Sequence, residues 1–236
     1  MTALRFWLVL LQLSGLAWAS NAEYVLKAYG LKIARLQINH DEKKHSITVS
    51  ANSLVTNKLF PQLNNRYLIK YRENYQPESL TRIIRQKHLS DTVVTEFDFE
   101  KGLAISTRKS DGSVSSYTIK SGTRDVFSFL AFVSTGKAAS GNYALDGNGL
   151  TWTALLQEKQ YEAIKCTAGK FQTRRYALQL RKPSGVKAPY VDMVTHNILS
   201  DDGSMNLWVG ENKLLVSASV KRRGITTTWD LVKFEP

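Results

Sequence analysis

The segment Thr123 to Lys137 reads Thr-Arg-Asp-Val-Phe-Ser-Phe-Leu-Ala-Phe-Val-Ser-Thr-Gly-Lys, and it has the clearest helical pattern in the chain. Four apolar residues recur at the spacing i, i+3, i+4 and i+7 of one helix face, namely Val126, Phe129, Leu130 and Val133. Phe127 and Phe132 widen the apolar surface beyond that stripe. We therefore expect this helix to be buried on most sides.

Both ends of this helix carry recognisable signals. Thr123 is a candidate N-cap, and Asp125 falls in the first turn, where a carboxylate interacts favourably with the helix dipole. Gly136 is expected to end the helix.

Most of the remaining chain alternates between apolar and polar residues, as half-buried strands do. The predicted strands are 23–39 (as one or two strands), 45–53, 66–72, 79–88, 92–99, 103–108, 114–120, 151–159, 160–167, 170–181, 190–198, 205–209, 214–221 and 225–234. Segment 79–88 is ambiguous because Leu80, Ile83 and Ile84 have helical spacing, but its β-branched residues and neighbouring strands favour a strand. No linker suggests a second domain. The sequence thus predicts a single mainly β domain over residues 20–236, with one helix held by a large antiparallel sheet.

Residues 1–19 have the features of a secretory signal peptide. Arg5 supplies a positive charge, a short apolar stretch follows, and Ala17-Trp18-Ala19 is a small-residue cleavage site. The alternative is an uncleaved membrane anchor, although the apolar run is too short to span a bilayer. We expect a periplasmic or secreted protein. Cys166 is the only cysteine, so no internal disulfide can form.

The chain is basic, with 32 Lys and Arg against 20 Asp and Glu. Removal of Arg5 with the signal peptide leaves 31 − 20 = +11. That charge favours anionic partners such as lipid head groups, so a peripheral contact with an anionic membrane is one expectation. A basic surface with no specific partner is the simpler interpretation. The motifs of nucleic-acid-binding proteins are absent, so we expect no nucleic-acid partner.

Five short motifs occur together in this chain. They are Glu96-Phe97-Asp98-Phe99, Arg124-Asp125-Val126-Phe127-Ser128, Thr167-Ala168-Gly169-Lys170-Phe171, Leu207-Trp208-Val209 and the final hairpin over residues 214–231. Together they resemble an exported bacterial family known as the domain of unknown function number thirty-one-oh-eight. The resemblance implies a strongly curved antiparallel sheet, or half-barrel, wrapped on one central helix, similar in architecture to periplasmic lipoprotein carriers. It implies no known activity.

No constellation of catalytic or metal-binding residues stands out, so we expect a protein that is not an enzyme and needs no cofactor or metal. The four histidines lack the spacing of a zinc site, and His196 falls on a predicted strand as a core or rim residue. Glu96 and Asp98 are two carboxylates on one strand face, more typical of a solvated face than of a glycosidase pair.

Aromatic residues are the candidates for ligand binding, namely Phe127, Phe132, Trp152, Trp208 and Trp229. One interpretation is that the tryptophans pack on the helix as core. The other is that one or two of them line a concave mouth for an apolar or glycan ligand.

Arg181, Lys182 and Lys187 form a candidate patch for an anionic partner. With 190–198 counted as a strand, this loop is expected at the opposite end of the sheet from the acidic turn 201–203. The turn 222–224 is expected beside that acidic turn, where Arg222 and Arg223 would be partly neutralised.

These observations leave three functional hypotheses. The first is a carrier or binding protein for an amphipathic envelope component, such as a lipid, an acylated protein or a glycan. The second is a structural or assembly factor that contacts other envelope proteins through a sheet edge or its basic face, with no internal cavity. The third and weakest is an envelope glycan hydrolase.

The signal peptide makes a direct prediction. N-terminal sequencing of the exported protein should begin Ser20-Asn21-Ala22, because cleavage is expected after Ala19. A mature chain that begins with Met1 would contradict it.

Overall fold

The computed structural model describes residues 19–57, 60–187, 189, 191–201 and 203–235. Residues 1–18 of the predicted signal peptide lie outside this range, so its cleavage stays a prediction. The strands are β1 (Ala19–Ala28), β2 (Leu31–Asp41), β3 (Ser46–Ser53), β4 (Asn64–Tyr71), β5 (Pro77–Gln86), β6 (Leu89–Asp98), β7 (Leu103–Arg108), β8 (Val114–Thr118), β9 (Arg124–Asp125), β10 (Gly141–Asp146), β11 (Thr151–Cys166), β12 (Gly169–Arg181), β13 (Ser204–Gly210), β14 (Leu215–Arg222) and β15 (Ile225–Glu235). The helices are α1 (Val126–Ser134) and α2 (Met193–Ile198).

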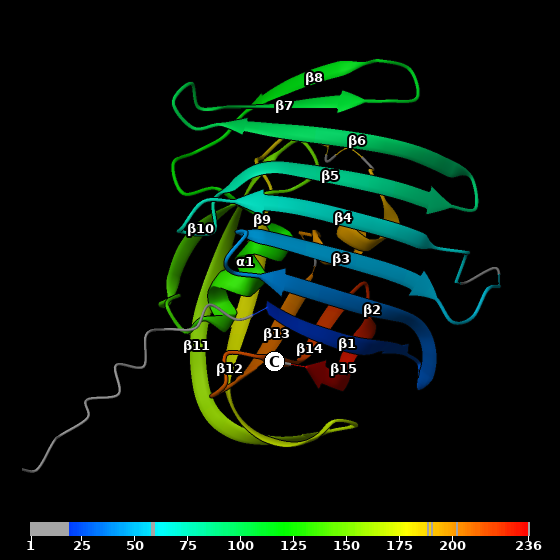
Figure 1. The fold of residues 1–236 in the computed structure, drawn as a ribbon, viewed down its shortest axis with the longest axis vertical. Helices are drawn as coiled ribbons and strands as arrows, with labels where there is room; N and C mark the ends of the chain where they lie inside the picture. The colour runs from blue at the N-terminus through cyan, green and yellow to red at the C-terminus, as the bar shows by residue number, and fades with distance from the viewer. Residues whose placement is uncertain (1–18, 58–59, 188, 190, 202, 236) are drawn as a thin grey trace, which may run out of the picture.

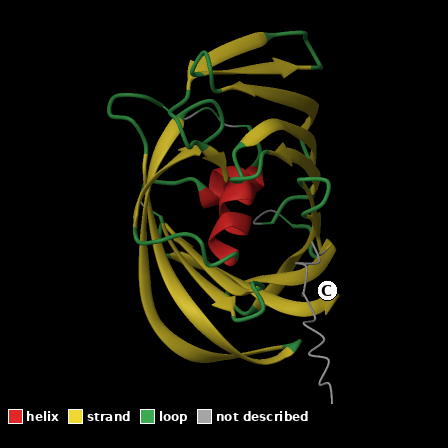
Figure 2. Cartoon of the chain, turned by 60° about the vertical axis from the view of Figure 1, so that its left-hand side comes forward, coloured by secondary structure: helices red, strands yellow, loops and turns green. Residues whose placement is uncertain are grey.

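All these strands belong to one sheet, in the order β8-β7-β6-β5-β4-β3-β2-β1-β15-β14-β13-β12-β11-β10-β9. The first eight strands and the last six each run as an antiparallel meander, and the two meanders join where β1 pairs with β15. The sheet is strongly curved and encloses α1 (Figures 1 and 2). The prediction of a curved, mainly β half-barrel around a central helix is confirmed. One detail differs, because the short pair of β9 and β10 is parallel.

Side chains connect the two edge regions of the curved sheet. Tyr117, at the end of β8, donates a hydrogen bond to Asp146 Oδ1 on β10 at 2.8 Å. Thr151 Oγ1 donates to the carbonyl of Thr118 at 2.8 Å. Arg82 on β5 pairs with Asp146 Oδ2 at 3.2 Å, and both side chains are buried. Polar side chains therefore connect the two ends of the open sheet at this point.

Helix α1 forms from the predicted segment, but it begins later than expected. Asp125 is the N-cap, and its Oδ1 accepts hydrogen bonds from the backbone N–H groups of Phe127 and Ser128. Thr123, the expected cap, instead donates from Oγ1 to the carbonyl of Lys120 and closes the preceding turn. The helix ends at Ser134, and Gly136 follows with a φ of +74°, which glycine adopts without strain.

The predicted strand at 190–198 is wrong, because residues 193–198 form helix α2. Asp192 caps this helix by accepting a hydrogen bond from the backbone N–H of Thr195 at 2.9 Å. Tyr67 on β4 donates to the same carboxylate oxygen at 2.7 Å and ties the helix start to the sheet. A short polar cap thus overrode the apolar alternation that favoured a strand.

Two other boundaries differ from the sequence predictions. The segments 151–159 and 160–167 form one strand, β11, whose register against β12 shifts between Glu158 and Tyr161. Strand β10 lies in a Gly- and Asn-rich stretch for which no element was predicted. The ambiguous segment 79–88 is a strand, as predicted.

Phe129 should be essential for the stability of the core. Its side chain is 1% exposed and packs against Tyr143 with ring centroids 5.3 Å apart. Phe129→Ala should lower the free energy of unfolding by about 3–5 kcal/mol, measured by chemical denaturation. Phe132→Ala on the same helix is the control and should cost less, because Phe132 is only half-buried. Equal losses in the two variants would contradict this assignment.

Candidate functional site

A cavity of about 430 Å³ lies between α2 and one end of the sheet. Its walls come from the β1–β2 turn region, the loop before β4, α2 and the β14–β15 hairpin. The lining residues are mostly apolar: Leu26, Ala28, Tyr29, Ile33, Ala34, Ser53, Phe60, Pro61, Leu63, Met193, Val194, Asn197, Ile198, Val220, Arg222, Arg223, Ile225, Thr227 and Trp229. We call this space the α2 cavity.

Helix α2 builds one wall of the α2 cavity. Met193, Val194, Asn197 and Ile198 line the cavity and follow the spacing of one helix face. Thr195 belongs to a buried polar cluster instead, where its Oγ1 lies 2.7 Å from Asp192 Oδ2 and 2.9 Å from Asn148 Oδ1 and has one proton to donate between them. The cluster fixes the orientation of a helix that is only six residues long.

The opposite wall comes from strands that are distant in sequence. Leu26 on β1 pairs with Trp229 on β15 and with Ala34 on β2, so these three side chains share one face of the sheet. Trp229 is 2% exposed and contacts the Tyr24 ring edge-on at 6.2 Å. Trp229, Leu26 and Ala34 therefore form this wall of the α2 cavity.

Among the described residues that line the α2 cavity, arginines are the only charged ones. Arg222 Nη1 donates a hydrogen bond to Asn197 Oδ1 at 2.9 Å, and its Nη2 lies 3.0 Å from His196 Nε2. Because a guanidinium only donates, His196 Nε2 must be the acceptor. Burial, together with the charges of Arg222 and Arg223, lowers the pKa of His196, which keeps this imidazole neutral.

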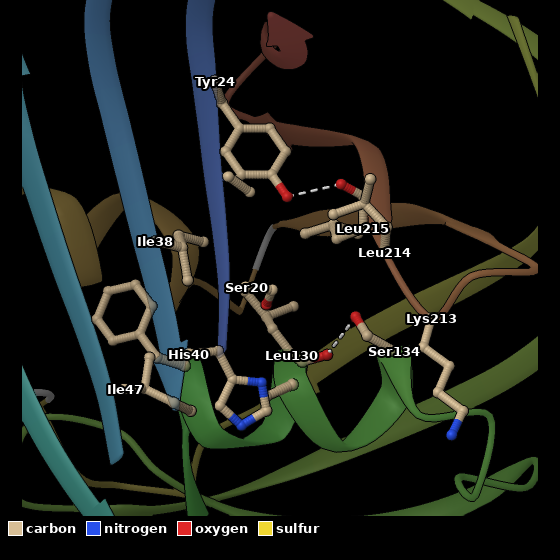
Figure 3. Close-up of a pocket in the computed structure, with 13 residues that line it drawn as sticks. Ser20, Tyr24, Ile38, His40, Ile47, Leu130, Ser134, Lys213, Leu214 and Leu215 are labelled. Atoms are coloured by element: carbon tan, nitrogen blue, oxygen red, sulfur yellow. Dashed lines mark hydrogen bonds between the residues drawn. The ribbon is translucent and has the colours of Figure 1, made fainter. Parts of the chain in front are cut away.

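A second, much smaller cavity of about 60 Å³ lies at the other end of the same strands, beside α1 (Figure 3). His40, Lys213 and Ser134 border it, and Tyr24 donates a hydrogen bond to the carbonyl of Leu215 at 2.6 Å (Figure 3). Ser134 Oγ in turn bonds the carbonyl of Leu130. This space suits a few water molecules at most, so the α2 cavity is the better candidate for a ligand.

The five predicted ligand-binding aromatic residues do not come together. Trp229 lines the α2 cavity, whereas Phe127 borders the smaller cavity. Trp152 is core, with its Nε1–H bonded to the carbonyl of Gly147 at 3.1 Å. Phe132 packs under the guanidinium of Arg124, 4.0 Å from its ring centroid.

Trp208 lies on the face of β13 opposite to the core. Its neighbours Leu207 and Val209 are buried, and its own Nε1–H donates to Glu162 Oε1 at 2.8 Å. Arg175 sits over the ring at 5.8 Å. The role of Trp208 in a concave mouth therefore has no support from its position.

The expected placement of the basic loop is wrong. Strand β12 pairs directly with β13, with Gln179 opposite Ser204, so the loop after Arg181 lies at the same end of the sheet as turn 201–203. The intervening segment holds α2 in place of the expected strand. Lys182 Nζ is 3.5 Å from Asp201 Oδ2, and the Lys182 backbone N–H donates to Asp201 Oδ1 at 2.8 Å.

The expected neighbourhood of turns 201–203 and 222–224 is confirmed, since Ser204 pairs with Lys221. Asp201 is engaged with Lys182, and Asp202 lies outside the described residues. Arg181 and Lys187 are exposed. Binding of an anionic partner by Arg181, Lys182 and Lys187 stays a prediction. These residues lie at the same end of the sheet as turns 201–203 and 222–224, not at the opposite end.

Other candidate chemistry remains dispersed. In the described part of the chain, no three or more His, Cys, Asp or Glu residues gather as metal ligands would. Glu96 is exposed, and Asp98 Oδ2 pairs with Lys101 at 3.0 Å. Cys166 is partly buried, and burial raises the pKa of its thiol. Neither helix in the described ranges is long and apolar enough to cross a membrane.

Comparison with known proteins supports the fold. The sequence matches no family model and no curated protein. The structure is similar to the β-barrel-like protein of the domain of unknown function DUF1849 from Brucella abortus, with a TM-score of 0.61 and 7% identity over 92% of this chain and 97% of that one. A candidate exported protein with a YmcC-like fold from Bacteroides fragilis has a TM-score of 0.39 and 8% identity, over 92% and 96% of the two chains. That second score is too low to carry an argument.

At 7% identity, the Brucella structure shows only that this chain has a β-barrel-like fold also found in a domain of unknown function. Membership of the family numbered thirty-one-oh-eight stays a prediction. The functional assignment therefore depends on the α2 cavity.

Stability should fall as the pH is lowered below about 6.5, the ordinary pKa of histidine. Burial lowers the pKa of both His40 and His196, so the unfolded chain binds more protons than the folded one in this pH range. Denaturation at pH 7.5 and 5.5 should show the loss. It should shrink in His40→Gln and persist in His88→Gln, which changes an exposed residue. An unchanged loss in His40→Gln would show that His40 does not contribute to it.

Proposed function

We propose that this protein is a non-catalytic, exported binding or carrier protein for an amphipathic component of the cell envelope. The observation that carries the proposal is the apolar α2 cavity of about 430 Å³ within the curved sheet. Export is supported by the signal-peptide features of residues 1–19.

The size and lining of the α2 cavity suit an apolar chain. Its volume falls in the lower half of the range of about 300–1,000 Å³ that is typical of ligand pockets. Leu63, Ile198 and Trp229 are buried side chains in its wall, so a bound chain would leave water on entering. One wall consists of paired strands and the other is the capped helix α2, so hydrogen bonds fix the backbone of both walls before a ligand binds. This arrangement favours a pre-formed site.

One observation favours the alternative of an assembly factor. Strand β8 is the last strand on its side of the sheet, and Val114 on it is 65% exposed. Ile105 on the neighbouring β7 is 42% exposed. An unpaired edge of this kind can add a strand from a partner. That hypothesis does not require an internal cavity, so the α2 cavity favours the carrier.

Filling the α2 cavity should abolish ligand binding. Ala34 lies in its wall at 5% exposure, and Ala34→Phe places a ring in the space. Binding of the neutral dye N-phenyl-1-naphthylamine, measured by fluorescence titration, should fall at least tenfold. Ala163→Phe on the exposed face of β11 is the matched control and should bind as the parent does.

A second variant, Val194→Trp, fills the α2 cavity from the side of α2. It tests the proposal independently if Ala34→Phe does not fold. Dye binding that survives in both folded variants would contradict the proposal. So would a parent protein that binds no dye and yields no amphiphile on solvent extraction.

A further inference from the structure

The α2 cavity has an asymmetric charge. Among the described residues that line it, the charged ones are Arg222 and Arg223, which are both cationic, and none is a carboxylate. The nearby Asp201 is engaged with Lys182. A neutral apolar ligand would need no such charge at the wall of its site.

In the part of the chain that the structure describes, Arg222 is held in place by uncharged groups. Its described partners, Asn197 and His196, are both neutral acceptors. A guanidinium has five N–H donors, and these two contacts use two of them. The buried Nε–H is among those that have no hydrogen-bond partner in the described residues. Leaving such donors unsatisfied is unfavourable, and an acceptor at this point would relieve it.

Helix α2 pre-orients this donor. Asn197 contacts Nη1 of Arg222, and His196 contacts Nη2. Both residues belong to α2, whose start is fixed by hydrogen bonds of Asp192 with Tyr67 and Thr195. Immobilising a long side chain before the ligand arrives lowers the entropic cost of binding. Arginine also matches the geometry of carboxylate and phosphate groups.

We propose that the α2 cavity binds a single-chain amphiphile with an anionic head, whose chain lies along the apolar wall and whose carboxylate or phosphate accepts hydrogen bonds from Arg222. This inference depends on the proposed carrier function, and it names the class of ligand. One chain is proposed because the cavity volume is in the lower half of the range for ligand pockets.

Three ligands with the same chain test the head group. Dodecanoate, dodecyl phosphate and dodecanol are titrated below their micelle concentrations against the protein with N-phenyl-1-naphthylamine bound, and displacement is measured. The parent should bind at least one anionic ligand about tenfold more tightly than dodecanol. The tighter of the two anions identifies the head chemistry. Added salt should reduce the preference, because it screens the partly exposed charge.

Arg222→Gln should remove this preference, because it should weaken binding of the anionic ligands about tenfold more than binding of dodecanol. Arg85→Gln changes an exposed arginine on β5, away from the cavity, and is the matched control. It should retain the preference. If Arg222→Gln does not fold, the preference and its salt dependence in the parent still decide the question.

The outcomes separate the two proposals. Equal affinity of the parent for all three ligands overturns the anionic head and leaves the carrier function intact. A preference that survives in folded Arg222→Gln overturns the role of Arg222. Failure of the dye and of all three ligands to bind overturns the carrier function itself.

Discussion

The concave face of the sheet is apolar along most of its length, and this surface must be covered if the chain is to fold. A sheet of 15 strands that curves into a barrel encloses more space than its own side chains fill. Helix α1 fills much of it with Phe129, Leu130 and Val133, all nearly inaccessible to water. Helix α2 covers the other end without filling it. The α2 cavity is the remaining space, so the site follows from incomplete coverage of one continuous apolar surface.

Buried polar groups set the position of the second helix. Tyr67 bonds Asp192, and burial together with that carboxylate raises the pKa of the Tyr67 hydroxyl well above its usual value. Thr195 and Asn148 extend the cluster toward the loop between β10 and β11. Near the same β10 end, Asp146 binds Arg82 and Tyr117. Removing one partner of such a buried pair costs more than the pair itself contributes, because the other charge is left uncompensated. The contacts that hold α2 and the contacts that connect the two ends of the sheet thus meet at the end of β10.

The sequence predicted the strands well because most have one buried and one exposed face. In β4, for example, Tyr67, Ile69 and Tyr71 are buried while Arg66 and Lys70 are exposed. Helix α1 was predicted from its apolar period, although Asp125 caps it in place of Thr123. Helix α2 was missed because six residues are too few to show a helical period, and its signal was the capping pair Asp192 and Thr195.

The site was harder to predict than the fold. Leu26 and Arg222 meet at one cavity although most of the chain separates them, and no local pattern reports such a contact. Successive side chains of a strand point to opposite faces of the sheet, and Trp208 lies between Leu207 and Val209, which are buried. This alternation would have excluded Trp208 from the concave face. The misplaced basic loop had a single cause. An extra strand at 190–198 reverses the direction expected for the strand before it, so Arg181 was expected at the wrong end of the sheet.

The pairing of β1 with β15 has a consequence for how the molecule folds. The two strands come from opposite ends of the chain, and the bond from Tyr24 to Leu215 spans 191 residues. Contacts of such long range slow folding, because loop closure must be accomplished before they form. The local hairpins of each meander can form early, but β1 has a free edge until the last strand has been synthesised. A chain truncated before β15 would expose two unpaired edges, on β1 and β14, and we expect such fragments to aggregate rather than to persist as half-barrels.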